Sequence, residues 1–208
     1  LTLLFPLRCL CFIMSTIYPL KDILVIGQFG DYEGKDEKDL LKITEKKDLL
    51  IVQIVQYKNS TLPIDSLTID GLELINKPLL VSNNDNTRIL WNGPKNWLLT
   101  SAKLNLIEEI KEKFNEKDFA VTNLSHSKAI IEIEGKSTKE ILKKGCPFNF
   151  NDLNKNNCLN STYNGMSITV DMLSDTPDRV RIFSLRSFGE SLYESLTDAS
   201  LEFGYIGK

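Results

Sequence analysis

Strand-like runs that alternate with short helix patterns most constrain what this chain can form. Apolar or alternating runs predict strands at 49–55, 88–91, 97–101, 119–124, 128–134, 159–163, 166–171 and 179–184. Helical spacing of apolar residues predicts helices over 106–114, 138–144 and 187–203. We interpret this pattern as two rounds of strands followed by a helix, which is a duplicated α+β unit. Because no Gly- or Ser-rich linker separates the rounds, we expect a single compact body.

Local signals sharpen several of these elements. Asn105 and Ser137 stand where each can cap its helix, and in both cases a glutamate three residues later completes a capping box. Asn164-Gly165 lies between two strand-like runs and predicts a type I′ hairpin, because both turn positions require a positive φ. The mixed charges of 34–48 predict a solvated loop or a surface helix.

Composition excludes several classes of function. The 208 residues carry a formal net charge of −3, and 42% of them are hydrophobic, as in an ordinary globular protein. Basic residues are spread among acidic ones and form no basic face, so nucleic-acid binding is not expected. No apolar run is long enough to cross a bilayer. We therefore expect a cytoplasmic protein with free thiols and no membrane partner.

The amino-terminal residues 1–13 (LTLLFPLRCLCFI) are apolar and are followed by Met14. Arg8 interrupts the apolar stretch, and no small-residue cleavage site follows it, so the segment does not fit a signal peptide. We expect residues 1–13 to be a non-native extension, Met14 to be the natural start, and 14–208 to form one domain.

Known catalytic motifs are missing from the sequence. Gly27, Gly30 and Gly34 are spaced differently from the glycines of a dinucleotide-binding loop. His126 is the single histidine and no C-x-x-C pair exists, so neither a metal centre nor a catalytic triad is favoured. Cys146 follows a helix carboxyl end, whose negative dipole disfavours the thiolate, and a packing role is expected. We expect no catalytic residue, cofactor or metal in this chain.

Several other residues are candidates for contact with a partner. Trp91 and Trp97 bracket a Gly-Pro turn and either anchor a partner chain or form a core pair inside a hairpin. Arg181 and Arg186 either meet an acidic partner surface or belong to an ordinary solvent-facing edge. Glu132 and the acid two residues later share one strand face, where an exposed acidic face is favoured over an acid–base pair.

The same regions carry a family resemblance. The run 88–99 (RILWNGPKNWLL) resembles the Trp-x-Gly-Pro-x-x-Trp signature of the sarcosine oxidase gamma subunit family. The runs 125–127 (SHS), 144–147 (KGCP) and 27–30 (GQFG) are similar to further elements of that family, and 186–188 (RSF) with 201–205 (LEFGY) fit its last helix. The family-motif or interface residues are Trp91, Gly93, Pro94, Trp97, Ser125, His126, Ser127, Gly145, Cys146, Pro147, Arg181 and Arg186.

The resemblance implies a fold shared with the folate-binding domain of aminomethyltransferases. It further implies a small, non-catalytic subunit that assembles with alpha, beta and delta subunits into a heterotetrameric flavoenzyme. Such an enzyme demethylates sarcosine to glycine, with hydrogen peroxide and either formaldehyde or methylene-tetrahydrofolate as further products. FAD, FMN, NAD, zinc and tetrahydrofolate would be bound by the other subunits.

A free-standing folate-binding protein is the alternative. An aminomethyltransferase of this type is usually longer and holds its pterin with an acidic residue. A folate-binding iron–sulfur repair factor would share the Lys144-Gly145-Cys146 element. The signature from Trp91 to Trp97 and the run 201–205 favour the oxidase subunit.

Overall fold

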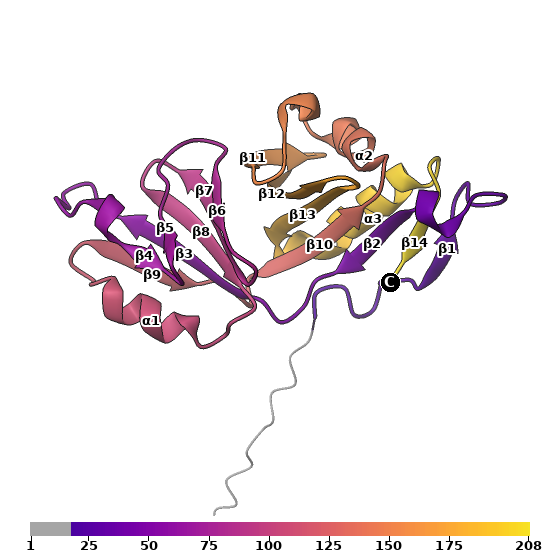
Figure 1. Cartoon of the computed structure of the whole chain (residues 1–208). Helices are drawn as coiled ribbons and strands as arrows, with labels where there is room; N and C mark the ends of the chain where they lie inside the picture. Colours follow the sequence, from indigo (N-terminus) through magenta and orange to yellow (C-terminus); the bar gives the residue numbers. More distant parts are fainter. Residues whose placement is uncertain (1–17) are drawn as a thin grey trace, which may run out of the picture.

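The strand patterns assemble into two main β-sheets that lie side by side (Figure 1). The seven-stranded sheet has the order β1 (Gly27–Phe29), β14 (Tyr205–Gly207), β2 (Leu41–Glu45), β10 (Lys128–Glu134), β13 (Asp178–Leu185), β12 (Met166–Asp175) and β11 (Cys158–Tyr163). The five-stranded sheet has the order β6 (Val81–Asn83), β7 (Thr87–Gly93), β8 (Asn96–Ser101), β3 (Leu50–Gln56) and β9 (Phe119–Asn123). A small ribbon joins β4 (Thr68–Ile69) to β5 (Leu72–Glu73).

This computed structural model describes residues 18–208, apart from the side chain of Asp65. The expectations for residues 1–13 and for Met14 as the natural start lie outside the described residues. Within 18–208 the α-helices are α1 (Leu106–Lys113), α2 (Thr138–Gly145) and α3 (Gly189–Ser200). Short 3-10 turns lie at Glu37–Asp39, Ile64–Ser66, Phe150–Asp152 and Arg186–Phe188.

The predicted helices are confirmed, but the predicted caps are wrong. Neither Asn105 nor Ser137 makes a side-chain hydrogen bond to its helix. A capping side chain reaches the first free N–H groups from an extended backbone, whereas Asn105 has helical angles (φ −72°, ψ −9°) and Ser137 has ψ near 11°. The last helix is shorter than the predicted 187–203, because a 3-10 turn precedes it and because it ends at Ser200, where residues 201–203 form a turn.

Each sheet has its own apolar core. On the seven-stranded sheet, α2 and α3 bury Ile141, Leu192 and Leu196 against the strands. On the five-stranded sheet, α1 buries Leu106 and Ile110 against its strands. A third cluster joins the two sheets to each other, with members from β3, β6, β7, β8, β10, β11 and β13. The α+β class and the single body are thereby confirmed.

One strand was missed in the sequence, and two turns connect strands as follows. The region 34–48 was expected to be a loop or helix, yet it contains β2, whose Leu41 and Ile43 are buried. The charged residues on either side made the alternation of buried and exposed residues in β2 hard to detect in the sequence. The turn that contains His126 joins β9 of one sheet to β10 of the other. The type I′ hairpin is confirmed, with positive φ at Asn164 (48°) and Gly165 (83°).

Candidate functional site

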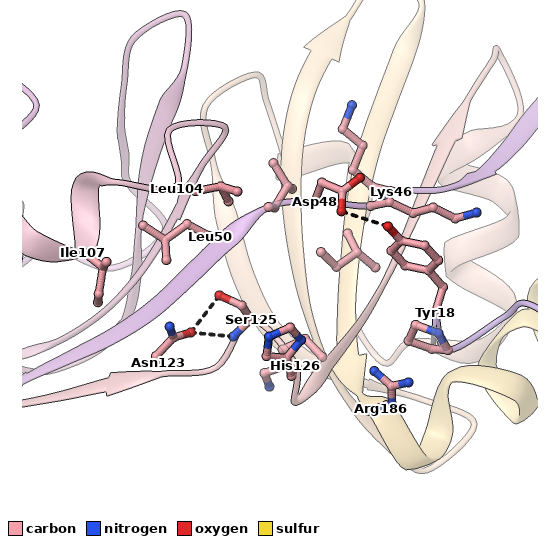
Figure 2. A pocket seen from close by; sticks show the side chains of 15 residues that line it. Tyr18, Lys46, Asp48, Leu50, Leu104, Ile107, Asn123, Ser125, His126 and Arg186 are labelled. Carbon is pink, nitrogen blue, oxygen red and sulfur yellow. Dashed lines mark hydrogen bonds between the residues drawn. The ribbon is translucent and has the colours of Figure 1, made fainter. Parts of the chain in front are cut away.

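The link between β2 and β3 and the turn between β9 and β10 both cross from one sheet to the other. Beside them lies a cavity of about 320 Å³, bounded also by Tyr18 and by the start of α1 (Figure 2). Of the twelve candidate residues, this cavity brings together Ser125, His126 and Arg186. Ser125 and His126 are neighbours in the sequence, whereas Arg186 lies about 60 residues later and reaches the same cavity through the fold.

Ser125 holds the turn in place. Its Oγ accepts a hydrogen bond from the backbone N–H of Ile51 (3.0 Å) and donates one to Oδ1 of Asn123 (2.7 Å). Ser127 contributes through its backbone, whose carbonyl accepts from the N–H of Arg186 (2.9 Å). Because the Ser125 proton is directed to Asn123, His126 does not activate this hydroxyl as a nucleophile. The geometry therefore gives Ser125 a structural role.

Tyr18 and Asp48 form another polar part of the cavity wall. The hydroxyl of Tyr18 donates to Oδ1 of Asp48 (2.9 Å), and this hydrogen bond raises the pKa of Tyr18 (Figure 2). The Lys47 ammonium lies 4.7 Å from the centre of the Tyr18 ring and 3.6 Å from Glu45. Glu45 is buried and accepts from the backbone N–H of Leu20 (3.0 Å). These contacts connect Tyr18 and Leu20 to the end of β2 and to the β2–β3 link.

Lys128 opens β10 and lines the same cavity. It is half-buried, and burial lowers the pKa of its ammonium, because desolvation disfavours the charged form. Sequence reasoning placed Lys128 on the strand but missed it as a site residue. Lys128 directly follows the run 125–127 but is not part of it, and its position in the cavity depends on the packing of two sheets.

Cys146 lies elsewhere, in the core of the seven-stranded sheet. Burial raises the pKa of its thiol to about 12, so the thiolate is not available near neutral pH. Gly145 packs so closely on Tyr163 that an added Cβ would lie 2.7 Å from the ring. Pro147 follows at the surface. The expected packing role of Cys146 agrees with this geometry.

The two tryptophans pair across β7 and β8 but differ in exposure. Trp97 is 0% exposed, and its Nε1 donates to the carbonyl of Ile75 (2.9 Å). Trp91 is half-buried, and its Nε1 donates to Oδ1 of Asn76 (3.3 Å). Gly93 ends β7, and Pro94 is exposed in the turn. Trp97 is thus a core residue, and Trp91 is the one with surface to offer a partner.

Arg181 does not belong to a solvent-facing edge. Its strand β13 lies between β10 and β12, and its guanidinium lies 2.6 Å from Oε1 of Glu132. Arg179 reaches the other carboxylate oxygen of Glu132 at 2.6 Å. Burial raises the pKa of Glu132, but the two guanidiniums outweigh it and hold that pKa below its usual value. The expectation of an exposed acidic face is therefore wrong for Glu132, which is buried and paired.

Another ion pair, which was missed in the sequence, joins the two sheets to each other. Arg88 of β7 donates from Nε and from one terminal nitrogen to the two oxygens of Asp171 on β12, both at 2.7 Å. Asp171 is 0% exposed. Arg88 also contacts Asn156 through a 3.3 Å hydrogen bond. A bidentate pair of this kind fixes the relative position of the two strands.

Comparison with solved structures identifies the fold. A chain of heterotetrameric sarcosine oxidase from Corynebacterium sp. U-96, in complex with pyrrole 2-carboxylate, matches with a TM-score of 0.72. The match covers 81% of this chain and 87% of that chain, at 20% identity. The chain has the fold of this sarcosine oxidase chain. A scan of family models and a search of curated protein sequences give no match.

The second similar structure is the glycine cleavage system aminomethyltransferase T from Bartonella henselae. It matches with a TM-score of 0.57 and 12% identity over 77% of this chain. This chain spans less than half of that protein's length, since the match covers 46% of it. The fold expected from the resemblance is therefore confirmed.

Two features are absent from the described part of the chain, a metal site and a membrane-spanning helix. Among residues 18–208, no three His, Cys, Asp or Glu side chains gather in a way that could hold a metal ion. In the same part, no helix is both long and apolar enough to cross a membrane.

Proposed function

We propose that this chain is the gamma subunit of a heterotetrameric sarcosine oxidase and that it serves assembly without taking part in the chemistry. The observation that carries the proposal is the structural match that covers most of both chains. A shared domain inside a much longer enzyme would leave most of the other chain unmatched, as the aminomethyltransferase does.

The chemistry of the side chains supports a non-catalytic role. The Ser125 hydroxyl is used to hold a turn, and the Cys146 thiol is buried with its pKa raised to about 12. Alpha, beta and delta subunits are the proposed partners, and FAD, FMN, NAD, zinc and tetrahydrofolate are proposed to reside on them. The proposed compartment is the cytoplasm, and the proposed reaction is oxidative demethylation of sarcosine.

A free-standing folate-binding protein is the second candidate, and the match to aminomethyltransferase T favours it. Its iron–sulfur repair form would depend on the cysteine of the Lys144-Gly145-Cys146 element. Here that cysteine is buried in a core, where a reactive or ligand-binding thiol is not expected.

Co-expression tests the proposal. The full chain is tagged and produced with neighbouring genes that encode candidate alpha, beta and delta subunits. We expect a yellow complex of four different chains that forms hydrogen peroxide when sarcosine is added. Omission of this chain should lower the yield of the assembled complex. A colourless single chain that binds tetrahydrofolate would overturn the proposal in favour of the second candidate.

A variant separates assembly from chemistry. Cys146→Ala should leave turnover per bound flavin within about two-fold of the unchanged complex, because the thiol takes no part in the transition state. A large loss of turnover in a complex of normal composition would contradict the non-catalytic role.

A further inference from the structure

The cavity between the sheets holds more positive than negative charge. Lys46, Lys47, Lys128 and Arg186 line it, together with a single carboxylate, that of Asp48. Asp48 accepts the hydrogen bond of the Tyr18 hydroxyl, and Lys47 has its own acid, Glu45. Within residues 18–208, neither of these two acids forms an ion pair with Lys128.

Among the cations of the cavity, Lys128 is the one whose charge is made unfavourable by burial. It is half-buried at the start of β10, and burial lowers the pKa of its ammonium. Within residues 18–208, no carboxylate forms an ion pair with it. A partly buried ammonium without a carboxylate is unfavourable, and a bound anion would stabilise it.

One end of the cavity is apolar. Leu50, Leu104 and Ile107 lie together there, whereas Tyr18, Lys46 and Arg186 lie at the other end (Figure 2). The Leu104 side chain is 59% exposed, which is high for a large apolar residue on a cavity wall. A ligand with an apolar body would cover it and remove this surface from water.

We propose that this cavity binds a small organic acid, with its carboxylate beside Lys128 and its apolar body against Leu104 and Ile107. The volume of about 320 Å³ lies at the lower end of the range for small-molecule sites, which suits a compact acid. The lining residues all come from this chain, and the proposal goes beyond its proposed role as a subunit.

Titration of the purified full chain tests the proposal by NMR, with benzoate as the probe. Benzoate should shift the backbone amides of 125–128 in a saturable way, with a dissociation constant of about 1 mM or tighter. Benzamide has the same shape without the charge, and acetate has the charge without the ring. Both should bind at least about ten-fold more weakly than benzoate, because each lacks one half of the recognition.

Variants locate the site. Lys128→Met keeps the length of the side chain and should weaken benzoate at least about ten-fold, because the charge-assisted hydrogen bond is lost. Lys111→Met is the matched control, since Lys111 is an exposed lysine on α1, and it should leave the affinity unchanged. Lys128→Glu should abolish binding. Unfolding curves of each variant verify that it is folded.

Four outcomes would overturn the proposal. These are no saturable shift with benzoate, equal affinity for benzamide, equal affinity for acetate, and unchanged affinity in the folded Lys128→Met variant. A carboxylate supplied by a partner chain is distinguished in the assembled complex. We expect benzoate to leave the complex intact, and release of a partner chain by benzoate would exclude a free acid as the occupant.

Discussion

The junction between the two sheets has two halves, which we call closed and open and which differ in how their charges are paired. In the closed half, Asp171 and Glu132 are buried and each is paired with arginine, Asp171 across the sheets with Arg88 and Glu132 with Arg181. In the open half, the described residues that line the cavity beside Lys128 include several cations and one acid, Asp48. Both halves use the same two sheets, so the difference lies in the side chains.

The paired charges of the closed half stabilise the fold, whereas Lys128 of the open half, which pairs with no carboxylate among the described residues, is a candidate for binding a ligand. A fully paired buried charge fixes the position of the strands that carry it, and it is costly to disturb. A partly buried cation without an acid costs stability, and a bound anion would offset that cost. The closed half is therefore expected to be sensitive in stability measurements, and the open half in binding measurements.

The largest effect is expected from Arg88→Met. The variant leaves the Asp171 carboxylate buried without its bidentate partner, and the free energy of unfolding should fall by about 3–5 kcal/mol. Urea denaturation measures the change. A loss below about 1 kcal/mol would mean that the pair does not hold the closed half together.

Two further variants sharpen this test. Lys38→Met breaks an exposed pair with Asp36, whose side chains are 77% and 72% exposed, and should change stability by less than about 0.5 kcal/mol. The double variant Arg88→Met with Asp171→Leu should be more stable than Arg88→Met alone, because it removes the unpaired buried charge.

The comparison also shows which features a sequence can predict. The hairpin at Asn164-Gly165, the helices near 106–114 and 138–144 and the strand near 49–55 depend on residues close in sequence, and all were predicted. The pair of Arg88 with Asp171 joins residues 83 positions apart in two different sheets, and no local pattern marks it.

In the candidate site too, features set by neighbouring residues were predicted, and contacts between distant residues were not. Ser125 and His126 were predicted together as one short run and Arg186 separately, but no sequence pattern places the run and Arg186 around one cavity. Glu132 was misread because an acid on a strand is usually exposed, whereas here the neighbouring strand supplies its arginines. The strand β2 was missed because charged neighbours concealed two buried residues.

An intermediate effect is expected from Glu132→Gln in the closed half. The change removes charge-assisted hydrogen bonds to Arg179 and Arg181, and stability at pH 7 should fall by about 1.5–3 kcal/mol. Because the pKa of Glu132 is lowered in the folded state, its contribution is present above the ordinary glutamate pKa and is lost as pH falls through the folded value. The stabilities of the two proteins should therefore begin to converge as the pH falls below the ordinary glutamate pKa of 4.5.

The matched control for this pH dependence is Glu140→Gln, which removes an exposed acid paired with Lys143 on α2. Its stability should stay within about 0.5 kcal/mol of the unchanged protein at every pH tested. A difference between Glu132→Gln and the unchanged protein that stayed constant down to pH 3 would contradict the lowered pKa of Glu132.

The smallest effect on stability is expected in the open half, from Lys128→Met. The folded state lowers the pKa of Lys128, so its charged form destabilises the fold below that pKa, and this cost disappears in the variant. The free energy of unfolding at pH 7 should stay the same or rise by up to about 0.5 kcal/mol. With benzoate at ten times its dissociation constant, the unchanged protein should gain about 1.4 kcal/mol and the variant far less. A clear loss of stability without ligand would show that Lys128 is paired within the fold and would remove the contrast between the two halves.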